Sequence, residues 1–174
     1  MGITLQKVSK IYSTGDVETV ALKEVDLEIS EGEIIVLLGP SGSGKSTLLN
    51  VCSGLDKPTS GTITIEGDVI SDMDNKQLTK FRRENLGFIF QQYNLLQTLS
   101  VKENVEGGHA VSKDPFTVEE IIEQVGLTPN MMKYPFQLSG GEQQSVSIAR
   151  AVVKKPKIIF CDEPTGALDE QNAK

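Results

Sequence analysis

The residues best suited to chemistry lie in the stretch Gly39-Pro-Ser-Gly-Ser-Gly-Lys-Ser-Thr47, which joins three glycines to a lysine and several hydroxyls. Glycines permit backbone angles and close approaches that side chains forbid, so successive N–H groups can surround an anion. Lys45 can reach the β- and γ-phosphates of a nucleotide, and the Ser46 hydroxyl has the size and hardness of a Mg²⁺ ligand. The stretch therefore predicts a phosphate-binding site.

Two adjacent carboxylates, Asp162 and Glu163, follow the apolar run Lys157–Cys161. A buried strand does not favour two charges side by side unless a cation or a reacting proton uses them. In a nucleotide site Asp162 would serve Mg²⁺, directly or through water, and Glu163 would activate a water for attack on the γ-phosphate. The alternative is that both acids emerge into solvent at the end of a strand.

Two further features allow more than one interpretation. The turn Ser139-Gly-Gly141 precedes a helical pattern, which makes it either a second anion site or an ordinary capped helix start. Tyr12 offers a ring on which a base could stack, or an aromatic side chain that packs on a sheet, and the local sequence favours packing.

The phosphate site needs a strand before it and a helix after it. Ile34 to Leu38 are continuously apolar and β-rich, which predicts a strand buried on both faces of a parallel sheet. A helix is expected from about Lys45 to Ser53, with its positive N-terminal end toward the anion.

Hydrophobic periodicity and turn residues predict the remaining elements. Strands are expected at Ile3–Lys10, Thr19–Ile29 and Leu86–Phe90, with a turn at Tyr12–Asp16 and a hairpin at Thr62–Ile70. Asp74 or Asn75 should cap a helix that ends near Arg83. Short helices are expected at Ser100–Gly107, Thr117–Val125 and Asn130–Lys133, and they predict a separate helical lobe because β-rich runs are missing there.

The composition of the 174 residues, with 38% hydrophobic and 24% charged side chains, is that of an ordinary soluble domain. A net charge of −7 argues against a nucleic-acid backbone as the main ligand. No apolar run approaches the roughly 20 residues that span a bilayer, and the first residues do not resemble a signal peptide. We therefore expect a cytoplasmic protein whose membrane role comes through a partner. Cys52 and Cys161 are predicted to be buried thiols.

The order of these features resembles the ATP-binding subunit of ATP-binding cassette (ABC) transporters over essentially the whole chain. The resemblance rests on the glycine-rich stretch, a glutamine after a strand, the phrase Leu138-Ser-Gly-Gly-Glu142, the paired acids and Ala167-Leu-Asp169. The phrases Gly54-Leu-Asp-Lys-Pro-Thr-Ser-Gly61 and Phe90-Gln-Gln-Tyr-Asn-Leu95 resemble the branch that serves lipoprotein-release, macrolide-export and antimicrobial-peptide-resistance permeases.

The resemblance implies a role for each matching residue, with ATP and Mg²⁺ as the ligands. Tyr12 would stack on adenine, which reverses the local preference for packing. Glu163, Lys45 and Gln91 would be catalytic, and Mg²⁺ would be held by Ser46, Gln91 and Asp162. The phosphates would be wrapped by Gly39, Ser41, Gly42, Ser43, Gly44, Lys45, Ser46 and Thr47. Ser139, Gly140 and Gly141 would bind the γ-phosphate of ATP held by another subunit.

The resemblance also implies an architecture and partners. The fold would be an α/β P-loop NTPase with an N-terminal antiparallel β-subdomain, a mixed central sheet and a small helical lobe. Residues 1–174 would form a single domain, with a nucleotide-binding core at 1–99 and 136–174 and the helical lobe at 100–135. The subunit would form a head-to-tail homodimer with ATP bound and sit on the inner face of the membrane through its permease, without nucleic acid.

Two departures from the family pattern affect these expectations. Ser145 stands where the family usually has arginine, so one charge expected in the signature helix is missing. The chain also stops at Lys174, before the strands and the switch histidine with which the family continues, so the expected fold is C-terminally incomplete with weak hydrolysis. The alternatives are a nucleotide-binding fragment with little hydrolysis of its own and a soluble, non-transport ABC ATPase.

Overall fold

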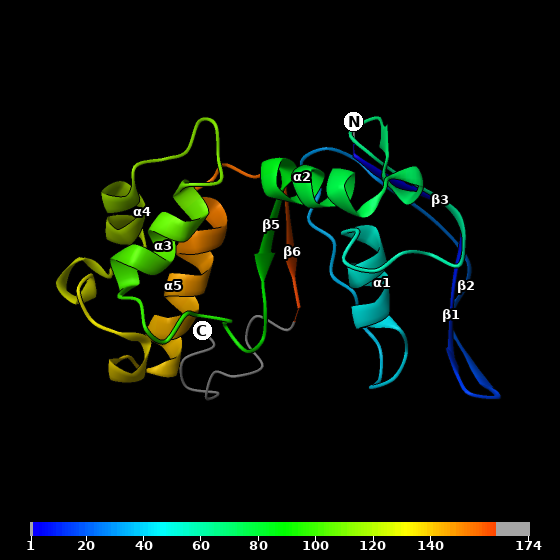
Figure 1. Cartoon of the computed structure of the whole chain (residues 1–174), viewed down its shortest axis with the longest axis horizontal. Coiled ribbons are helices and arrows are strands. Elements are labelled where there is room, and N and C mark those ends of the chain that lie inside the picture. Colours follow the sequence, from blue (N-terminus) through cyan, green and yellow to red (C-terminus); the bar gives the residue numbers. More distant parts are fainter. Residues whose placement is uncertain (1, 163–174) are drawn as a thin grey trace. The chain divides into compact units, whose positions relative to one another are not determined.

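The computed structural model describes residues 2–162, and the chain divides into two compact units, Met1–Lys80 and Phe81–Lys174. Figure 1 shows the elements of both units in the order of the chain. Among the described residues, no helix is both long enough and apolar enough to cross a membrane.

The first unit is built on an antiparallel sheet. Strands β1 (Ile3–Thr14) and β2 (Val17–Ile29) form a long hairpin, and β3 (Ser60–Ile65) and β4 (Asp68–Val69) extend it in the order β2-β1-β3-β4. Alternate residues of β1 and β3 are buried, as a sheet with one covered face requires. Helix α1 (Lys45–Cys52) contacts both β1 and β2, and a 3₁₀ turn (Ile70–Asp72) follows β4. The two predicted strands and the predicted helix are confirmed here, although Tyr12 lies within β1 rather than in a turn.

The predicted strand at Ile34–Leu38 is wrong in this structure. Residues 33–40 have no regular secondary structure, and the side chains of Ile34 and Leu38 are 92% and 89% exposed. A parallel strand is stable only when neighbouring strands take its backbone hydrogen bonds and other layers cover both faces. The sheet described in this unit is antiparallel, and none of its strands pairs with this segment.

The second unit combines a small parallel sheet with packed helices. Helix α2 (Asn75–Asn85) begins in the first unit and its last residues lead into β5 (Leu86–Ile89) of the second unit, which pairs in parallel with β6 (Ile158–Cys161). Asp74 begins α2 as predicted, because its carboxylate accepts from the Gln77 N–H at 2.8 Å and the Gln77 side chain accepts from the Asp74 N–H.

Three helices of this unit share one hydrophobic core. They are α3 (Val101–His109), α4 (Val118–Gln124) and α5 (Gly140–Val152), and Val105, Ile122 and Val146 are fully buried between them. Gly108 allows the close approach of α3 and α5, because a Cβ there would lie 2.3 Å from the backbone oxygen of Arg150. The predicted starts at Ser100 and Thr117 are confirmed as capping boxes.

Two smaller expectations for this unit are wrong. Instead of a helix at Asn130–Lys133 there is a 3₁₀ turn at Thr128–Asn130, with proline in its first turn, and a second one at Pro135–Gln137. Cys161 is exposed rather than buried, whereas Cys52 is buried as predicted. In β6 alternate residues face opposite sides, so an apolar run does not bury every member.

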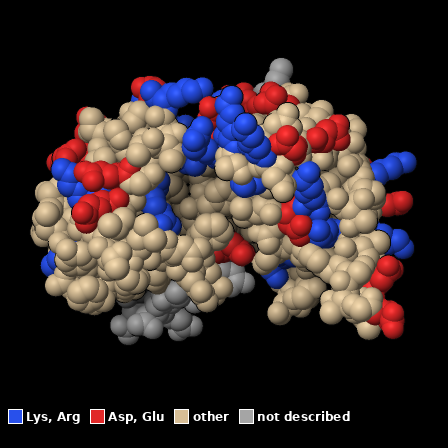
Figure 2. Space-filling view, viewed as in Figure 1, with Lys and Arg blue, Asp and Glu red and all other residues tan. Residues whose placement is uncertain are grey.

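Charged side chains are interspersed over the face seen in Figure 2, where acidic and basic groups lie next to one another. The basic residues Arg82 and Arg83 lie in the last turn of α2, where positive charge favours the helix dipole. The charge on this face therefore produces no broad field of one sign.

Candidate functional site

The glycine-rich stretch forms an exposed loop that opens directly into α1. Gly44 is the N-cap of α1 in the left-handed region at φ 89°, and Gly42 has φ 79°. The Lys45 ammonium folds back over the loop and donates to the carbonyl oxygens of Gly39 and Pro40, each at 2.9 Å. The lysine is thus held by carbonyl groups of the loop. The first N–H groups of any helix have no partner within that helix, so the start of α1 is suited to binding an anion.

The glycines of this loop fit a phosphate cradle by their surroundings. A Cβ on Gly44 would lie 2.7 Å from the backbone oxygen of Ala21, and a Cβ on Gly39 would lie 2.7 Å from the Ser43 hydroxyl oxygen. At Gly44 the contact is with a backbone atom and φ is positive, so the loop conformation requires glycine there, whereas at Gly39 the Ser43 side chain could rotate away.

Tyr12 belongs to the same unit as this loop, and the strand register relates the two. Gly44 packs against Ala21 of β2, and the neighbouring residue Val20 pairs with Ile11 of β1. Tyr12 is the next residue of β1 and pairs with Thr19, with its side chain 40% exposed. The aromatic ring and the phosphate-type loop are therefore held by one hairpin.

Gln91 and Asp162 lie at one edge of the parallel sheet in the second unit. Ile89 pairs with Cys161, so Gln91 follows the carboxyl end of β5 and Asp162 follows the carboxyl end of β6. The Asp162 N–H donates to the Ile89 oxygen at 3.0 Å and continues the pairing by one residue. The carboxyl edge of parallel strands is where α/β proteins place ligand-binding groups.

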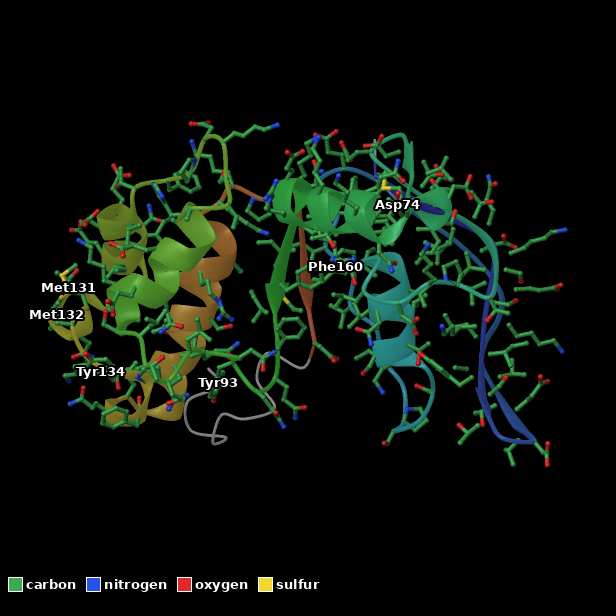
Figure 3. All side chains as sticks on the ribbon, in the orientation of Figure 1. Asp74, Tyr93, Met131, Met132, Tyr134 and Phe160 are labelled. Atoms are coloured by element: carbon green, nitrogen blue, oxygen red, sulfur yellow. The ribbon has the colours of Figure 1, made fainter. Side chains whose placement is uncertain are left out.

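The loop after Gln91 is braced by residues that the sequence analysis did not single out. The Arg150 guanidinium of α5 donates to the carbonyl oxygens of Tyr93 at 2.8 Å and Asn94 at 2.6 Å, and burial lowers the pKa of that guanidinium. Both residues have positive φ values of 49°, which non-glycine residues rarely adopt. Figure 3 marks Tyr93 in this loop.

Asn104 of α3 fixes the next part of the same loop. Its buried side chain accepts from the Leu96 N–H and donates to the carbonyls of Leu96, Leu99 and Ser100. The sequence carries a signal for this contact: Asn104 is a polar residue at a position where the helical pattern predicts a buried side chain.

The turn Ser139-Gly-Gly forms the start of α5. The Ser139 hydroxyl accepts from the Glu142 N–H at 3.3 Å, and the Glu142 carboxylate accepts from the Ser139 N–H at 2.7 Å. The hydrogen bond from the Ser139 backbone is the largest cause that lowers the pKa of the Glu142 carboxyl, and the bond with the Ser139 side chain lowers it further. The turn is therefore a capped helix start, as one interpretation predicted. Gly140 is exposed and Gly141 is half-buried, so an anion site at the same helix start stays a prediction. Ser145 donates to the Gly141 oxygen at 3.0 Å within the same helix.

The predicted residues are divided between the two compact units. The first unit holds Tyr12 and the glycine-rich loop, and the second unit holds Gln91, Asp162 and the Ser139 turn. Glu163 and the segment 167–169 lie outside the described residues.

Comparisons with known proteins agree with these motifs. The profile of the ABC transporter family matches residues 22–166. A putative ABC transporter ATP-binding protein of Mycoplasma pneumoniae is 49% identical over 170 residues, which cover 96% of this chain and 37% of that protein. The chain therefore spans little more than a third of the length of this relative.

Two relatives have names that state an export role. The bacitracin export ATP-binding protein BceA of Halalkalibacterium halodurans is 43% identical, over 95% of this chain and 68% of that protein. The macrolide export ATP-binding/permease protein MacB of Hyphomonas neptunium is 45% identical, over 96% of this chain and 27% of that protein. Both belong to the branch expected from the sequence.

A solved structure shows the same fold. The dimeric ATP-binding cassette MJ0796, in a post-hydrolysis state bound to ADP and phosphate, superposes with a TM-score of 0.88 at 42% identity, covering 98% of this chain and 77% of that one. The expected α/β P-loop fold is thereby confirmed.

Proposed function

Because this chain belongs to the ABC transporter family of ATP-binding domains, we propose that it binds ATP and Mg²⁺ and powers a membrane permease that exports its substrate. The observation that carries the proposal is the loop at Gly39–Thr47, in which Gly42 and Gly44 have positive φ values, Gly44 has no room for a Cβ, and the chain leads directly into a helix start. A loop of this geometry has a direct use in binding phosphate groups.

In this proposal the first unit binds the nucleotide. The loop N–H groups and the start of α1 hold the phosphates, Lys45 moves from its carbonyl partners to the β- and γ-phosphates, and Tyr12 stacks on adenine. The positive charge of Lys45 then stabilises the charge that develops on the transferred phosphate.

The second unit would supply most of the groups that act on the terminal phosphate. Gln91 and Asp162 of this unit, with Ser46 of the first unit, offer the hard oxygen donors that Mg²⁺ prefers, and the metal would neutralise phosphate charge when bound. Glu163 would accept a proton from the attacking water. Gln91 precedes the loop that Asn104 of α3 fixes, so a change at the metal site would pass into the helices at residues 100–135, which we assign to a permease-contacting lobe.

The central test is nucleotide binding by titration calorimetry with ATP and Mg²⁺. Lys45→Ala should weaken binding at least tenfold, because a charge-assisted contact to phosphate is lost. Lys23→Ala, at an exposed lysine of β2, is the matched control and should leave binding unchanged. Equal affinity for both variants and the unmodified chain would refute the proposal.

The proposed dimer requires Ser139 to face ATP bound by a second copy. In a protein that contains the whole subunit and its permease, Ser139→Ala should lower hydrolysis more than tenfold. The substitution also removes a helix cap, so Thr117→Ala, which removes the same type of cap from α4, controls for stability. Similar hydrolysis in both variants would reject the dimer.

We further propose that the 174 residues alone hydrolyse ATP weakly. We also propose that the core at 1–99 and 136–174 and the helical lobe at 100–135 form one domain. Robust turnover that Glu163→Gln abolishes would contradict this. Binding without hydrolysis in the complete protein would instead favour a nucleotide-binding module, the second candidate.

A further inference from the structure

Tyr12 lies in a closed polar cluster with Lys10 and Asp56, two residues to which no role has been assigned so far. The Asp56 carboxylate accepts from the Lys10 ammonium at 2.8 Å through Oδ1 and from the Tyr12 hydroxyl at 2.9 Å through Oδ2. The same ammonium donates to the Lys57 carbonyl oxygen at 2.8 Å and lies 4.8 Å from the centre of the Tyr12 ring. Each group in the cluster therefore has its partners within the cluster or the adjoining backbone.

This arrangement leaves one part of Tyr12 available to a ligand. Its hydroxyl is already bonded to Asp56, and the Lys10 ammonium covers one face of the ring in a cation–π contact. The side chain is nevertheless 40% exposed. Any ligand contact therefore falls on the uncovered face, which suits stacking by a flat base and not a hydrogen bond to the hydroxyl.

Asp56 is itself fixed from two directions. Its backbone N–H donates to the Asn50 oxygen near the end of α1 at 3.1 Å. The loop that carries it is bonded to β1, because the Ile11 N–H donates to the Thr59 hydroxyl at 2.9 Å and the Thr59 N–H donates to the Ser9 oxygen at 2.8 Å. Asp56 therefore connects the strand of the aromatic ring to the far end of the helix that begins at the glycine-rich loop.

We propose that Asp56 is a positioning residue for nucleotide binding: it fixes the orientation of the Tyr12 ring and, through α1, the separation between the base and the phosphates. The inference rests on the proposed function, because it assumes that Tyr12 stacks on the base of a nucleotide held at Lys45. A ring held in place before binding loses less conformational entropy when the base arrives.

The charge state of Asp56 agrees with this role. Partial burial would raise the pKa of the Asp56 carboxyl, but the hydrogen bonds from Lys10 and Tyr12 together lower the pKa below its ordinary value. The carboxylate is thus ionised at neutral pH and accepts both bonds.

The test compares two probes, ATP and inorganic tripolyphosphate, both with Mg²⁺. Asp56→Ala should weaken ATP binding about 3- to 10-fold, since the ring must then be ordered by the ligand, and should leave tripolyphosphate binding unchanged because that probe has no base. Tyr12→Phe keeps the ring but cuts the same hydrogen bond, so it should weaken ATP binding to a similar extent. Asp26→Ala, which removes a carboxylate bonded to the Lys7 N–H in the same sheet, is the control and should change neither affinity.

The outcomes separate this inference from the proposed function. If Tyr12→Ala weakens ATP binding but Asp56→Ala and Tyr12→Phe do not, Asp56 has no positioning role and the nucleotide site stands. If Asp56→Ala weakens both probes equally, its role is structural and the inference is overturned. If Tyr12→Ala leaves ATP binding unchanged, base stacking itself is refuted. An effect of Asp56→Ala that disappears in the Tyr12→Ala background supports the inference, because it shows that Asp56 acts through the ring.

Discussion

Replacing Gly44 by alanine tests whether the loop geometry serves ligand binding. Gly44 has φ 89°, and an added Cβ would lie 2.7 Å from the Ala21 oxygen and 3.4 Å from a methyl carbon of Leu22. The left-handed conformation alone costs a non-glycine residue about 1–2 kcal/mol. The close contact adds to this cost because the Ala21 oxygen belongs to the backbone and cannot rotate away as a side-chain atom can, so the loop or β2 must shift.

A control variant separates the conformational cost of Gly44→Ala from its steric cost. Gly15, in the β1–β2 turn, has φ 60°, but a Cβ there would meet nothing within 4 Å. Gly15→Ala should therefore lower the free energy of unfolding by only about 1–2 kcal/mol, as the conformational cost requires. Gly44→Ala should lower it by more, and the difference measures the steric contact with β2.

The assay is urea denaturation together with ATP titration for both variants. Gly44→Ala should also weaken ATP binding at least tenfold, because the N–H groups at the start of α1 move with the loop, whereas Gly15→Ala should bind as the unmodified chain does. The reasoning fails if Gly44→Ala binds ATP normally, or if both variants lose the same stability and the same affinity.

Three further predictions follow from other contacts. Gly108→Ala should destabilise the second unit, because the added Cβ would lie 2.3 Å from a backbone oxygen of α5. Gly107→Ala is the control: its Cβ would meet nothing within 4 Å, so it should stabilise α3 by about 0.5–1 kcal/mol. Denaturation curves measure both effects. Burial raises the pKa of the Cys52 thiol to about 12, so at pH 8 a thiol reagent should label exposed Cys161 and spare Cys52 until the chain unfolds, and rapid double labelling of the folded chain would contradict the burial. The pKa of the Asp56 carboxyl lies below its ordinary value of 3.8, so its contribution to stability is complete above pH 3.8 and is lost as the pH falls through the lower folded-state pKa. Asp56→Asn should remove this loss of stability in acid, as measured by thermal melts at several pH values. Identical pH profiles for the variant and the unmodified chain would contradict the prediction.

Much of the candidate site could be predicted because its signals are local. The glycines and Lys45 of the loop stand within nine consecutive residues, and their spacing alone specifies a turn followed by a helix start. The caps at Asp74 and Ser139 are also local, since each side chain bonds a backbone group three residues away.

Other features could not be predicted because they depend on residues far apart in the chain. The hydrogen bond that holds the Tyr12 hydroxyl is accepted by Asp56, 44 positions away, and the brace on the loop after Gln91 comes from Arg150, 57 positions from Tyr93. The apolar run Ile34–Leu38 has the composition of a buried strand, but composition does not supply the neighbouring strand that would accept its hydrogen bonds.

The sequence by itself determined which chemical groups this chain offers: a glycine-rich loop with a lysine, a helix start with two glycines and a carboxylate after an apolar strand. These are short-range properties, because backbone angles, caps and the alternation of side chains are set within a few residues. Only the tertiary structure decided which segments meet, placing Tyr12 on the hairpin that supports Gly44, and pairing β5 with β6 so that Gln91 and Asp162 follow the same edge of one sheet. Such meetings depend on strand register and packing between distant segments, which no local pattern specifies.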